Sequence, residues 1–285
     1  MSQPKQSAAT SNSQPGFAHK KSLGQNFLTS PIVPGWMCDA ANINTGDNVL
    51  EIGPGTGALT DILLARGAHV IAIEADRRAL EHLKEKYADQ LAAKRLSLIQ
   101  SDARELDLAN LGLKPGKFKV VANIPYYLTG LLLRHCLQTT VQPSTLVFLL
   151  QKEVVTRITR APKESLLSLS VKAFGTPHYY KTVSRGHFHP APKIDSAILQ
   201  VTDITLDNFS NLAEAEFFFT IIHLGFGQKR KQLLGNLAQK YPRTDLEQIF
   251  TTLKIPLTIR AEDIKLPTWL VLIKQLRSIH QLPTS

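Results

Sequence analysis

From about residue 45 onward, the sequence repeats one unit, which consists of a short apolar stretch, a turn and an amphipathic helical pattern. Helical patterns over residues 56–67 and 76–92 separate the first apolar stretches. Alternating strands and helices predict an α/β fold with a doubly wound, mostly parallel sheet. Five stretches have the near-continuous apolar character of strands that are covered on both faces, namely residues 47–53, 69–75, 96–102, 118–124 and 144–150.

The chain changes character after these units. Residues 177–188 and 196–204 have strand-like patterns with no long helix between them, which predicts an antiparallel hairpin at an edge of the sheet. We expect one domain over residues 19–207, a small all-α domain over residues 208–285, and a disordered tail in the polar residues 1–18. The helical patterns of the second domain cover residues 212–227, 228–240, 244–254 and 267–280.

Composition and charge narrow the class of protein. The apolar runs are too short to span a bilayer, so we expect no membrane partner. Cys38 and Cys136 form no C-x-x-C motif, which fits reduced thiols and a cytoplasmic location. A net charge of +10 favours an acidic partner, most simply nucleic acid. A basic protein without such a partner is the alternative.

The stretch "LEIGPGTGALT" joins an apolar strand to a helix through three glycines, Gly53, Gly55 and Gly57. Glycines here let the backbone approach a ligand closely, and the following helix start offers unpaired N–H groups. The spacing is G-x-G-x-G, whereas the dinucleotide fingerprint is G-x-G-x-x-G. The loop therefore suits S-adenosylmethionine, which carries no pyrophosphate.

Two acids follow the next two strands. Glu74 ends the second strand, where a carboxylate can accept hydrogen bonds from ribose hydroxyls. Asp102 follows the third strand, where it can accept from an adenine amino group. Each acid alone also fits a helix N-cap or a solvated turn. With the glycine loop, the pair predicts a cofactor that contains a nucleoside.

The fourth strand runs into "NIPYY", residues 123–127. The Asn123 amide oxygen and a backbone carbonyl of Ile124 or Pro125 can hold the two hydrogens of an exocyclic amine. This grip would direct the nitrogen lone pair at an activated methyl group, and the chemistry then needs positioning but no metal or strong base. Tyr126 offers a ring on which the base can stack. A simple turn at a strand exit is the alternative.

Six stretches together resemble the ribosomal RNA adenine N6-dimethyltransferases in order and spacing, over about residues 19–280. The resemblance implies a Rossmann-like, class I S-adenosylmethionine methyltransferase with a helical RNA-binding domain at the C-terminus. It also implies cofactor contacts by Asn26, Leu28, Gly53, Glu74, Asp102 and Asn123, and a second aromatic, Phe188, that faces Tyr126 across the target base. The stretches are "KKSLGQNFL", "LEIGPGTGALT", "NIPYY", "QKEVVTRI", "HFHPAPKIDSA" and "FGQKRKQLLGNL".

The same resemblance implies a substrate: two adjacent adenines in the 3′-terminal hairpin of small-subunit rRNA. The enzyme would act as a monomer and as a checkpoint on the immature small subunit. Two alternatives stay open, namely the related branch that methylates large-subunit rRNA and confers antibiotic resistance, and a non-catalytic RNA-binding assembly or transcription factor. The helical C-terminus and "HPAPKIDSA" look more like the first branch.

Basic residues are expected to hold the RNA phosphates around a base that has left its stack. A cluster in the first turn of the predicted helix 228–240 suggests an external anion, although a solvated helix end is equally compatible. His187 and His189 flank Phe188 but have no further partners for a metal site, so we interpret them as RNA-contacting or inert. The basic candidates are Lys20, Lys21, Lys152, Arg157, Arg160, Arg185, Lys193, Lys229, Arg230 and Lys231.

Overall fold

The computed structural model describes residues 27–228 and 230–279. Strand β6 (Thr145–Gln151) shows why a central strand of this chain is apolar between its two end residues. Leu146, Phe148 and Leu150 belong to one buried cluster, whereas Val147 and Leu149 belong to a second. Because successive side chains of a strand point to opposite faces, the sheet is covered on both sides.

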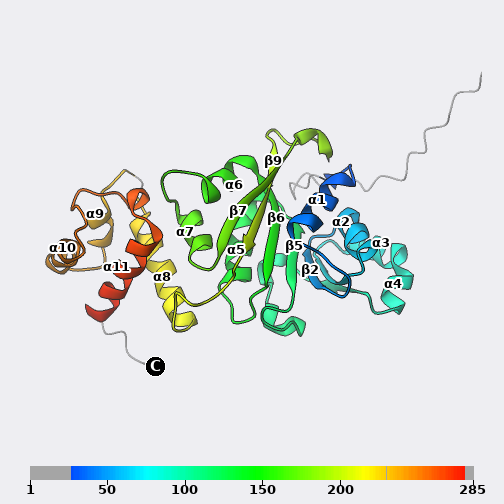
Figure 1. Cartoon of the computed structure of the whole chain (residues 1–285), viewed down its shortest axis with the longest axis horizontal. Helices are drawn as coiled ribbons and strands as arrows, with labels where there is room; N and C mark the ends of the chain where they lie inside the picture. The colour runs from blue at the N-terminus through cyan, green and yellow to red at the C-terminus, as the bar shows by residue number, and fades with distance from the viewer. Residues whose placement is uncertain (1–26, 229, 280–285) are drawn as a thin grey trace, which may run out of the picture.

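Seven strands form one sheet in the order β4–β3–β2–β5–β6–β9–β7 (Figure 1). The first five in this order are parallel, and β9 is antiparallel to both of its neighbours, β6 and β7, which confirms the predicted doubly wound sheet with an antiparallel edge. The strand order reverses between β2 and β5, and ligands of such sheets bind at the carboxyl ends of the strands at this point. Besides β6, the strands are β2 (Asn48–Ile52), β3 (His69–Glu74), β4 (Leu96–Gln100), β5 (Lys119–Asn123), β7 (Thr176–Val183) and β9 (Ser196–Thr202).

Helices cover the two faces of the sheet. The first three, α1 (Ile32–Ala40), α2 (Ala58–Ala65) and α3 (Arg77–Lys86), pack into one of the clusters, and α5 (Thr129–Leu137), α6 (Lys152–Thr159) and α7 (Leu166–Lys172) pack into the other. The helix predicted over residues 76–92 is divided at Tyr87 into α3 and α4 (Ala88–Ala92). Short 3-10 helices are η2 (Ala103–Glu105), η3 (Leu108–Leu111), η4 (Tyr126–Leu128), η5 (Arg185–His187) and η6 (Ala261–Asp263).

A second, two-stranded sheet was not predicted. Strand β1 (Phe27–Leu28) pairs antiparallel with β8 (Phe188–His189), and Leu28 lies opposite Phe188. The Thr29 N–H extends this pairing by donating to the His187 carbonyl at 3.0 Å. The pair ties the start of the described chain to the connection between β7 and β9. The predicted tail over residues 1–18 lies outside the described residues, as do Lys20, Lys21, Asn26 and Lys229.

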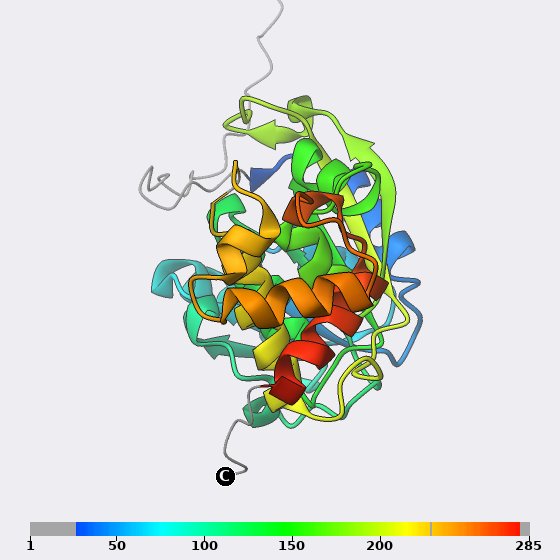
Figure 2. The same ribbon diagram turned by 90° about the vertical axis from the view of Figure 1, so that its left-hand side faces the viewer.

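The C-terminal part is helical, as predicted, and packs beside α5 and α7 (Figures 1 and 2). One prediction was wrong here: the helix expected over residues 228–240 begins only at Leu233. Arg230 and Lys231 lie in the turn before it, so no basic cluster occupies its first turn, where the helix dipole disfavours cations. The four helices are α8 (Leu212–Gly225), α9 (Leu233–Leu237), α10 (Arg243–Thr252) and α11 (Leu266–Ile279). Within the described ranges, none of the helices is long and apolar enough to cross a membrane.

Candidate active site

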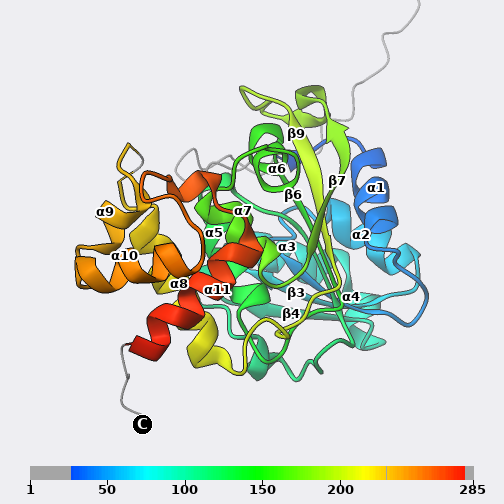
Figure 3. The ribbon, with the colours of Figure 1, turned by 60° about the vertical axis from the view of Figure 1, so that its left-hand side comes forward.

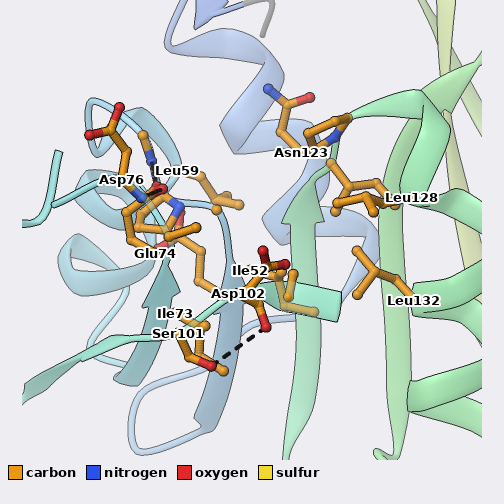
Figure 4. Close-up of a pocket in the computed structure, with 18 of the residues that line it drawn as sticks. Ile52, Leu59, Ile73, Glu74, Asp76, Ser101, Asp102, Asn123, Leu128 and Leu132 are labelled. Carbon is orange, nitrogen blue, oxygen red and sulfur yellow. Dashed lines mark hydrogen bonds between the residues drawn. The ribbon is translucent and has the colours of Figure 1, made fainter. Parts of the chain in front are cut away.

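A cavity lies at the carboxyl ends of β2, β3 and β5, where the strand order reverses (Figure 4). The glycine loop forms one wall. Gly53 and Gly55 line the cavity with φ angles of +71° and +57°, which side chains rarely tolerate. Gly57 does not line it and has a packing role instead: a Cβ there would lie 2.3 Å from the Tyr87 hydroxyl oxygen.

Glu74 ends β3 and lines the cavity although it is only 4% exposed. Its Oε2 accepts the Gly55 N–H at 3.1 Å, and its Oε1 accepts the Asp76 N–H at 2.9 Å. The first of these bonds holds the glycine loop against the end of β3, and the second fixes the turn that follows β3. An ionised carboxylate offers about four acceptor positions, so the side chain keeps capacity for ribose hydroxyls.

Asp102 lies on the wall of the cavity two residues beyond β4 (Figure 4). It is the N-cap of η2, and its Oδ1 accepts the Arg104 N–H at 2.8 Å. The Arg104 guanidinium pairs with Oδ2 at 2.6 Å, and these Arg104 contacts lower the pKa of Asp102. The capping role left open by the sequence is therefore present in the structure. The contact with an adenine amino group stays a prediction.

Asn123 ends β5 on the opposite wall (Figure 4). Ile124, Pro125 and Tyr126 follow it in the chain and also line the cavity. The Pro125 carbonyl accepts the Leu128 N–H at 3.0 Å and so closes η4. Among the described residues, none donates a hydrogen bond to the Ile124 carbonyl. Which of the two carbonyls would be the second acceptor for an amine stays a prediction.

Of the site residues predicted from the N-terminal and "HFHPAPK" stretches, only some line the cavity in the described structure. Leu28 lines it, and Asn26 lies outside the described residues. Phe188 is not on the wall: it is 5% exposed and packs in the cluster that contains residues of α1 and α2. The expectation that Phe188 faces Tyr126 across a base stays a prediction.

Glu51 is a residue of the cavity that the motif reasoning missed. It lies within β2, is 1% exposed, and accepts the Thr60 hydroxyl at 2.7 Å. Burial raises the pKa of its carboxyl to about 8. The signal was present in the sequence, because Glu51 is the one charged residue in the otherwise apolar "VLEI". Ser196 at the start of β9 was also missed, and it contacts Tyr126.

The charges of the cavity test which cofactor fits. Glu74, Asp76 and Asp102 lie on its wall beside Glu51, whose raised pKa favours the neutral, protonated form near pH 7, and Arg104 is the only Lys or Arg among its described lining residues. A pyrophosphate would meet these carboxylates unfavourably, whereas S-adenosylmethionine carries a sulfonium and an ammonium group. The apolar wall, which includes Ile52 and Leu132, suits the remainder of a nucleoside. Fold and cavity together define an S-adenosylmethionine-dependent methyltransferase.

The particular kind of methyltransferase follows from comparison with known proteins. The chain belongs to the ribosomal RNA adenine dimethylase family, whose sequence model matches residues 16–277. It is 35% identical over 279 residues to ribosomal RNA small subunit methyltransferase A of Streptococcus agalactiae, covering 93% of this chain and 94% of the relative. The enzyme of the same name from Fusobacterium nucleatum is 32% identical over 262 residues, with coverage of 90% and 97%.

Two solved structures have the same fold. A dimethyladenosine transferase from Plasmodium falciparum has a TM-score of 0.74 at 24% identity and covers 88% of this chain and 98% of its own. The 23S rRNA methyltransferase ErmE has a TM-score of 0.66 at 25% identity, with coverage of 88% and 99%. The chain is thus an S-adenosylmethionine-dependent rRNA adenine dimethyltransferase, as its motifs predicted.

The two histidines beside Phe188 have different surroundings. His187 packs edge-on against Trp36, with 5.9 Å between the ring centroids, and His189 is exposed in β8. Across residues 27–228 and 230–279, no group of three His, Cys, Asp or Glu side chains is arranged to hold a metal ion.

The described basic candidates lie on α6 or directly after it, in the connection between β7 and β9, and in the turn between α8 and α9. Lys152 begins α6 directly after β6, and Arg185 and Lys193 lie in the connection between β7 and β9. That connection and the turn between α8 and α9 both lie toward the top of Figure 3. None of the described candidates forms an ion pair with a described carboxylate, and all are exposed: Lys152, Arg157, Arg160, Arg185, Lys193, Arg230 and Lys231.

Proposed function

We propose that the substrate of this enzyme is small-subunit rRNA, and that two adjacent adenines of its 3′-terminal hairpin are each converted to N6,N6-dimethyladenine. The relatives named above are small-subunit rRNA methyltransferases and match nearly the whole chain. The observation that carries the adenine assignment is the position of Asn123, which ends β5 on the cavity wall opposite the acids. An amide oxygen and a neighbouring carbonyl there suit an exocyclic NH2 group.

The protein's part in the reaction is to orient the amine. The Asn123 Oδ1 and the Ile124 carbonyl each accept one amine hydrogen, so the nitrogen lone pair points into the cavity. S-adenosylmethionine supplies a methyl group that is already activated by its sulfonium. The Tyr126 ring stacks on the base and fixes its plane, and stacking of this kind contributes about 1–3 kcal/mol. After transfer, one of the two acceptors holds the surplus amine proton until water removes it.

The residues that we assign to the cofactor lie mainly on the wall opposite Asn123, where the acids and the glycine loop are found. We assign the ribose hydroxyls to Glu74 and the adenine amino group of the cofactor to Asp102, with Gly53 and Gly55 giving close backbone approach. Leu28 contributes an apolar contact, and Asn26 precedes it in the chain. Asn123 borders both the cofactor and the target base. Phe188 would join the base only if β8 moves toward the cavity when RNA binds.

The RNA itself is held by exposed cations that lack carboxylate partners in the described chain. Such residues are well placed to exchange mobile counterions for RNA phosphates, and binding should then weaken as salt rises. Two come from the turn before α9, which supports an RNA-binding role for residues 208–285 beside a methyltransferase domain over 19–207. Since one chain carries the full set of cavity groups, we propose that it acts as a monomer on the immature small subunit in the cytoplasm. Bound there, it would delay subunit maturation until it leaves.

One experiment tests the proposed substrate. Small and large ribosomal subunits that lack the modification are incubated separately with the protein and S-adenosylmethionine labelled in its methyl group. We expect label on two adjacent adenines near the 3′ end of small-subunit RNA. Label confined to large-subunit RNA would favour the branch that methylates large-subunit rRNA, the RNA on which the 23S rRNA methyltransferase ErmE acts. Absence of label on both would contradict the proposed substrate and favour a non-catalytic role.

A further inference from the structure

The Tyr126 phenol is held by a residue 70 positions away in the sequence. Its oxygen lies 3.0 Å from the Ser196 hydroxyl oxygen, and either atom can be the donor. Ser196 is fully buried, and Tyr126 is half-buried on the cavity wall. The hydrogen bond therefore connects the Tyr126 ring, which is expected to stack on the base, with the start of strand β9.

The position of Ser196 is set by the sheet and not by the tyrosine. It is the first residue of β9 and pairs with Gln151 of β6 and Val183 of β7. Because β9 is antiparallel to β6, its first residue lies at the edge where β5 and β6 end. The preceding residue is also fixed: the Asp195 carbonyl accepts the Lys152 N–H at 3.0 Å. Ser196 is thus a rigid anchor.

The other end of Tyr126 is held as well. Thr129 donates its hydroxyl hydrogen to the Tyr126 carbonyl at 2.8 Å. The neighbouring Tyr127 contrasts with this arrangement, because it is 66% exposed. The Tyr126 ring is consequently oriented before a base arrives, and such preorganisation reduces the entropy lost on binding.

Resting on the proposed adenine dimethylation, we propose that Ser196 is a positioning residue that controls how far methylation proceeds, because it is needed more for the second methyl transfer than for the first. An unmethylated amine presents two hydrogens, one each for Asn123 and Ile124. After one methyl transfer a single hydrogen remains, so one of these contacts is lost. The orientation of the base then depends more heavily on its stacking against Tyr126, and hence on the bond that holds this ring.

The test compares the two transfer steps in variants that lose this bond. Ser196→Ala and Tyr126→Phe remove this bond from opposite ends. Tyr126→Phe keeps the aromatic ring and creates no void, so it tests the inference even if Ser196→Ala fails to fold. Modification-free small subunits and S-adenosylmethionine are the substrates, and N6-methyladenine and N6,N6-dimethyladenine are quantified over time in digested RNA. Thr182→Ala is the matched control, because it removes a 2.7 Å bond between a hydroxyl and Tyr179 away from the cavity.

We expect both test variants to slow the second transfer about tenfold more than the first, which is within the range for a small misplacement of reacting groups. Monomethylated adenine should then accumulate, while affinity for S-adenosylhomocysteine and the product ratio of the control stay unchanged. Equal slowing of both transfers, or no slowing, would overturn the inference and would mean that Ser196 has only a structural role. If the wild-type protein leaves small-subunit RNA without dimethyladenine, the proposed substrate fails first, and this inference fails with it.

Discussion

The polar groups that we assign to ligand binding in this cavity are mostly side-chain oxygen atoms. On one wall they belong to carboxylates, whose other contacts hold the loops in place, as Glu74 does for Gly55. On the other wall the amide of Asn123 is uncharged, so it can accept from an amine without capturing the cofactor's positive charge. Most groups assigned to the cofactor thus lie on one wall and the groups assigned to the target amine on the other, so a substitution of Asn123 should affect turnover more than cofactor binding.

Replacing Asn123 tests that separation. Asn123→Ala should reduce turnover by at least about 100-fold, the loss typical of removing one preorganised polar contact at a reacting group. Binding of S-adenosylhomocysteine, measured by calorimetry, should change little because the acids on the opposite wall are intact. Asn110→Ala is the control, since Asn110 is exposed in η3. Unchanged turnover in the Asn123 variant would remove the amine grip from the mechanism.

The buried Glu51 carboxyl leads to a second prediction, which concerns how the stability of the protein depends on pH. Burial raises its pKa from 4.5 to about 8, and nearby Asp61 and Glu74 add to the rise. Between these pH values the folded protein holds a proton that the unfolded chain releases. The free energy of unfolding therefore falls as pH rises from about 4.5 to 8, by at most about 1.4 kcal/mol per pH unit. The stability that depends on the protonated Glu51 carboxyl is fully present only below pH 4.5.

Glu51→Gln should abolish this contribution, because a glutamine can still accept the Thr60 hydroxyl but does not titrate. Urea unfolding of both proteins at several pH values between 5 and 8 should show the variant gaining stability relative to the wild type as pH rises. Glu85→Gln, an exposed change on α3, should leave the pH profile as it is. Parallel profiles for the Glu51 variant and the wild type would show that the buried carboxyl is already ionised.

At the scale of elements, the glycine loop combines two functions that the motif alone does not separate. Gly53 and Gly57 both have positive φ angles, +71° and +86°. Of these two, Gly53 lines the cavity and Gly57 does not, and a Cβ on Gly53 would meet nothing within 4 Å. Gly57 instead caps α2, and its carbonyl accepts the Tyr87 hydroxyl at 2.8 Å. The loop is thus attached to the α3–α4 junction.

A pair of matched substitutions distinguishes these functions. Gly53→Ala should cost roughly 1 kcal/mol of stability through backbone strain and should weaken cofactor binding. Gly57→Ala should cost more, roughly 3 kcal/mol, because the added methyl must also displace the Tyr87 ring. Chemical denaturation and calorimetry with S-adenosylhomocysteine measure the two effects. Equal losses of stability in both variants would contradict the packing role of Gly57.

How far the sequence predicts these elements depends on the range of the interactions that form them. The five parallel strands follow from apolar runs, and Glu74, Asp102 and Asn123 follow from their places at strand ends. The β1–β8 pair leaves no periodic signal, because each strand has two residues and they lie about 160 positions apart. The Ser196–Tyr126 bond is equally remote from local pattern, since it depends on β9 returning antiparallel beside β6.

The turn between α8 and α9 gives a further prediction. Arg230 and Lys231 are exposed there, and the Asn236 amide fixes the turn by donating to the Gly225 carbonyl at 2.6 Å. Replacing both cations with alanine should weaken RNA binding and reduce the slope of log K against log salt by about one per cation. Arg243→Ala is the control, because Arg243 is already paired with Glu247. An unchanged salt slope, measured by filter binding, would exclude this turn from the RNA contact.

At the scale of the whole molecule, the core crosses the expected domain boundary at residue 207. One buried cluster contains Val120 and Phe148 of the sheet together with Phe218 of α8 and Trp269 of α11. Ion pairs join the same parts at the surface, for example Arg134 with Glu216 at 2.7 Å. Exposed pairs of this kind contribute about 1 kcal/mol or less, so the shared apolar core is the main connection. We therefore expect the two parts to unfold together.

The two tryptophans of the chain provide the test, because Trp36 lies in α1 and Trp269 in α11. Trp36→Phe and Trp269→Phe each leave one reporter, in the C-terminal and N-terminal part respectively. In each variant, the urea transition seen by fluorescence should coincide with that seen by far-UV circular dichroism, as two-state unfolding requires. The comparison is made within each variant, so a loss of stability from the buried Trp269 substitution does not affect it. If Trp269 fluorescence changes at lower urea than the circular dichroism, the helical part unfolds independently and the shared core is too weak to couple it to the sheet.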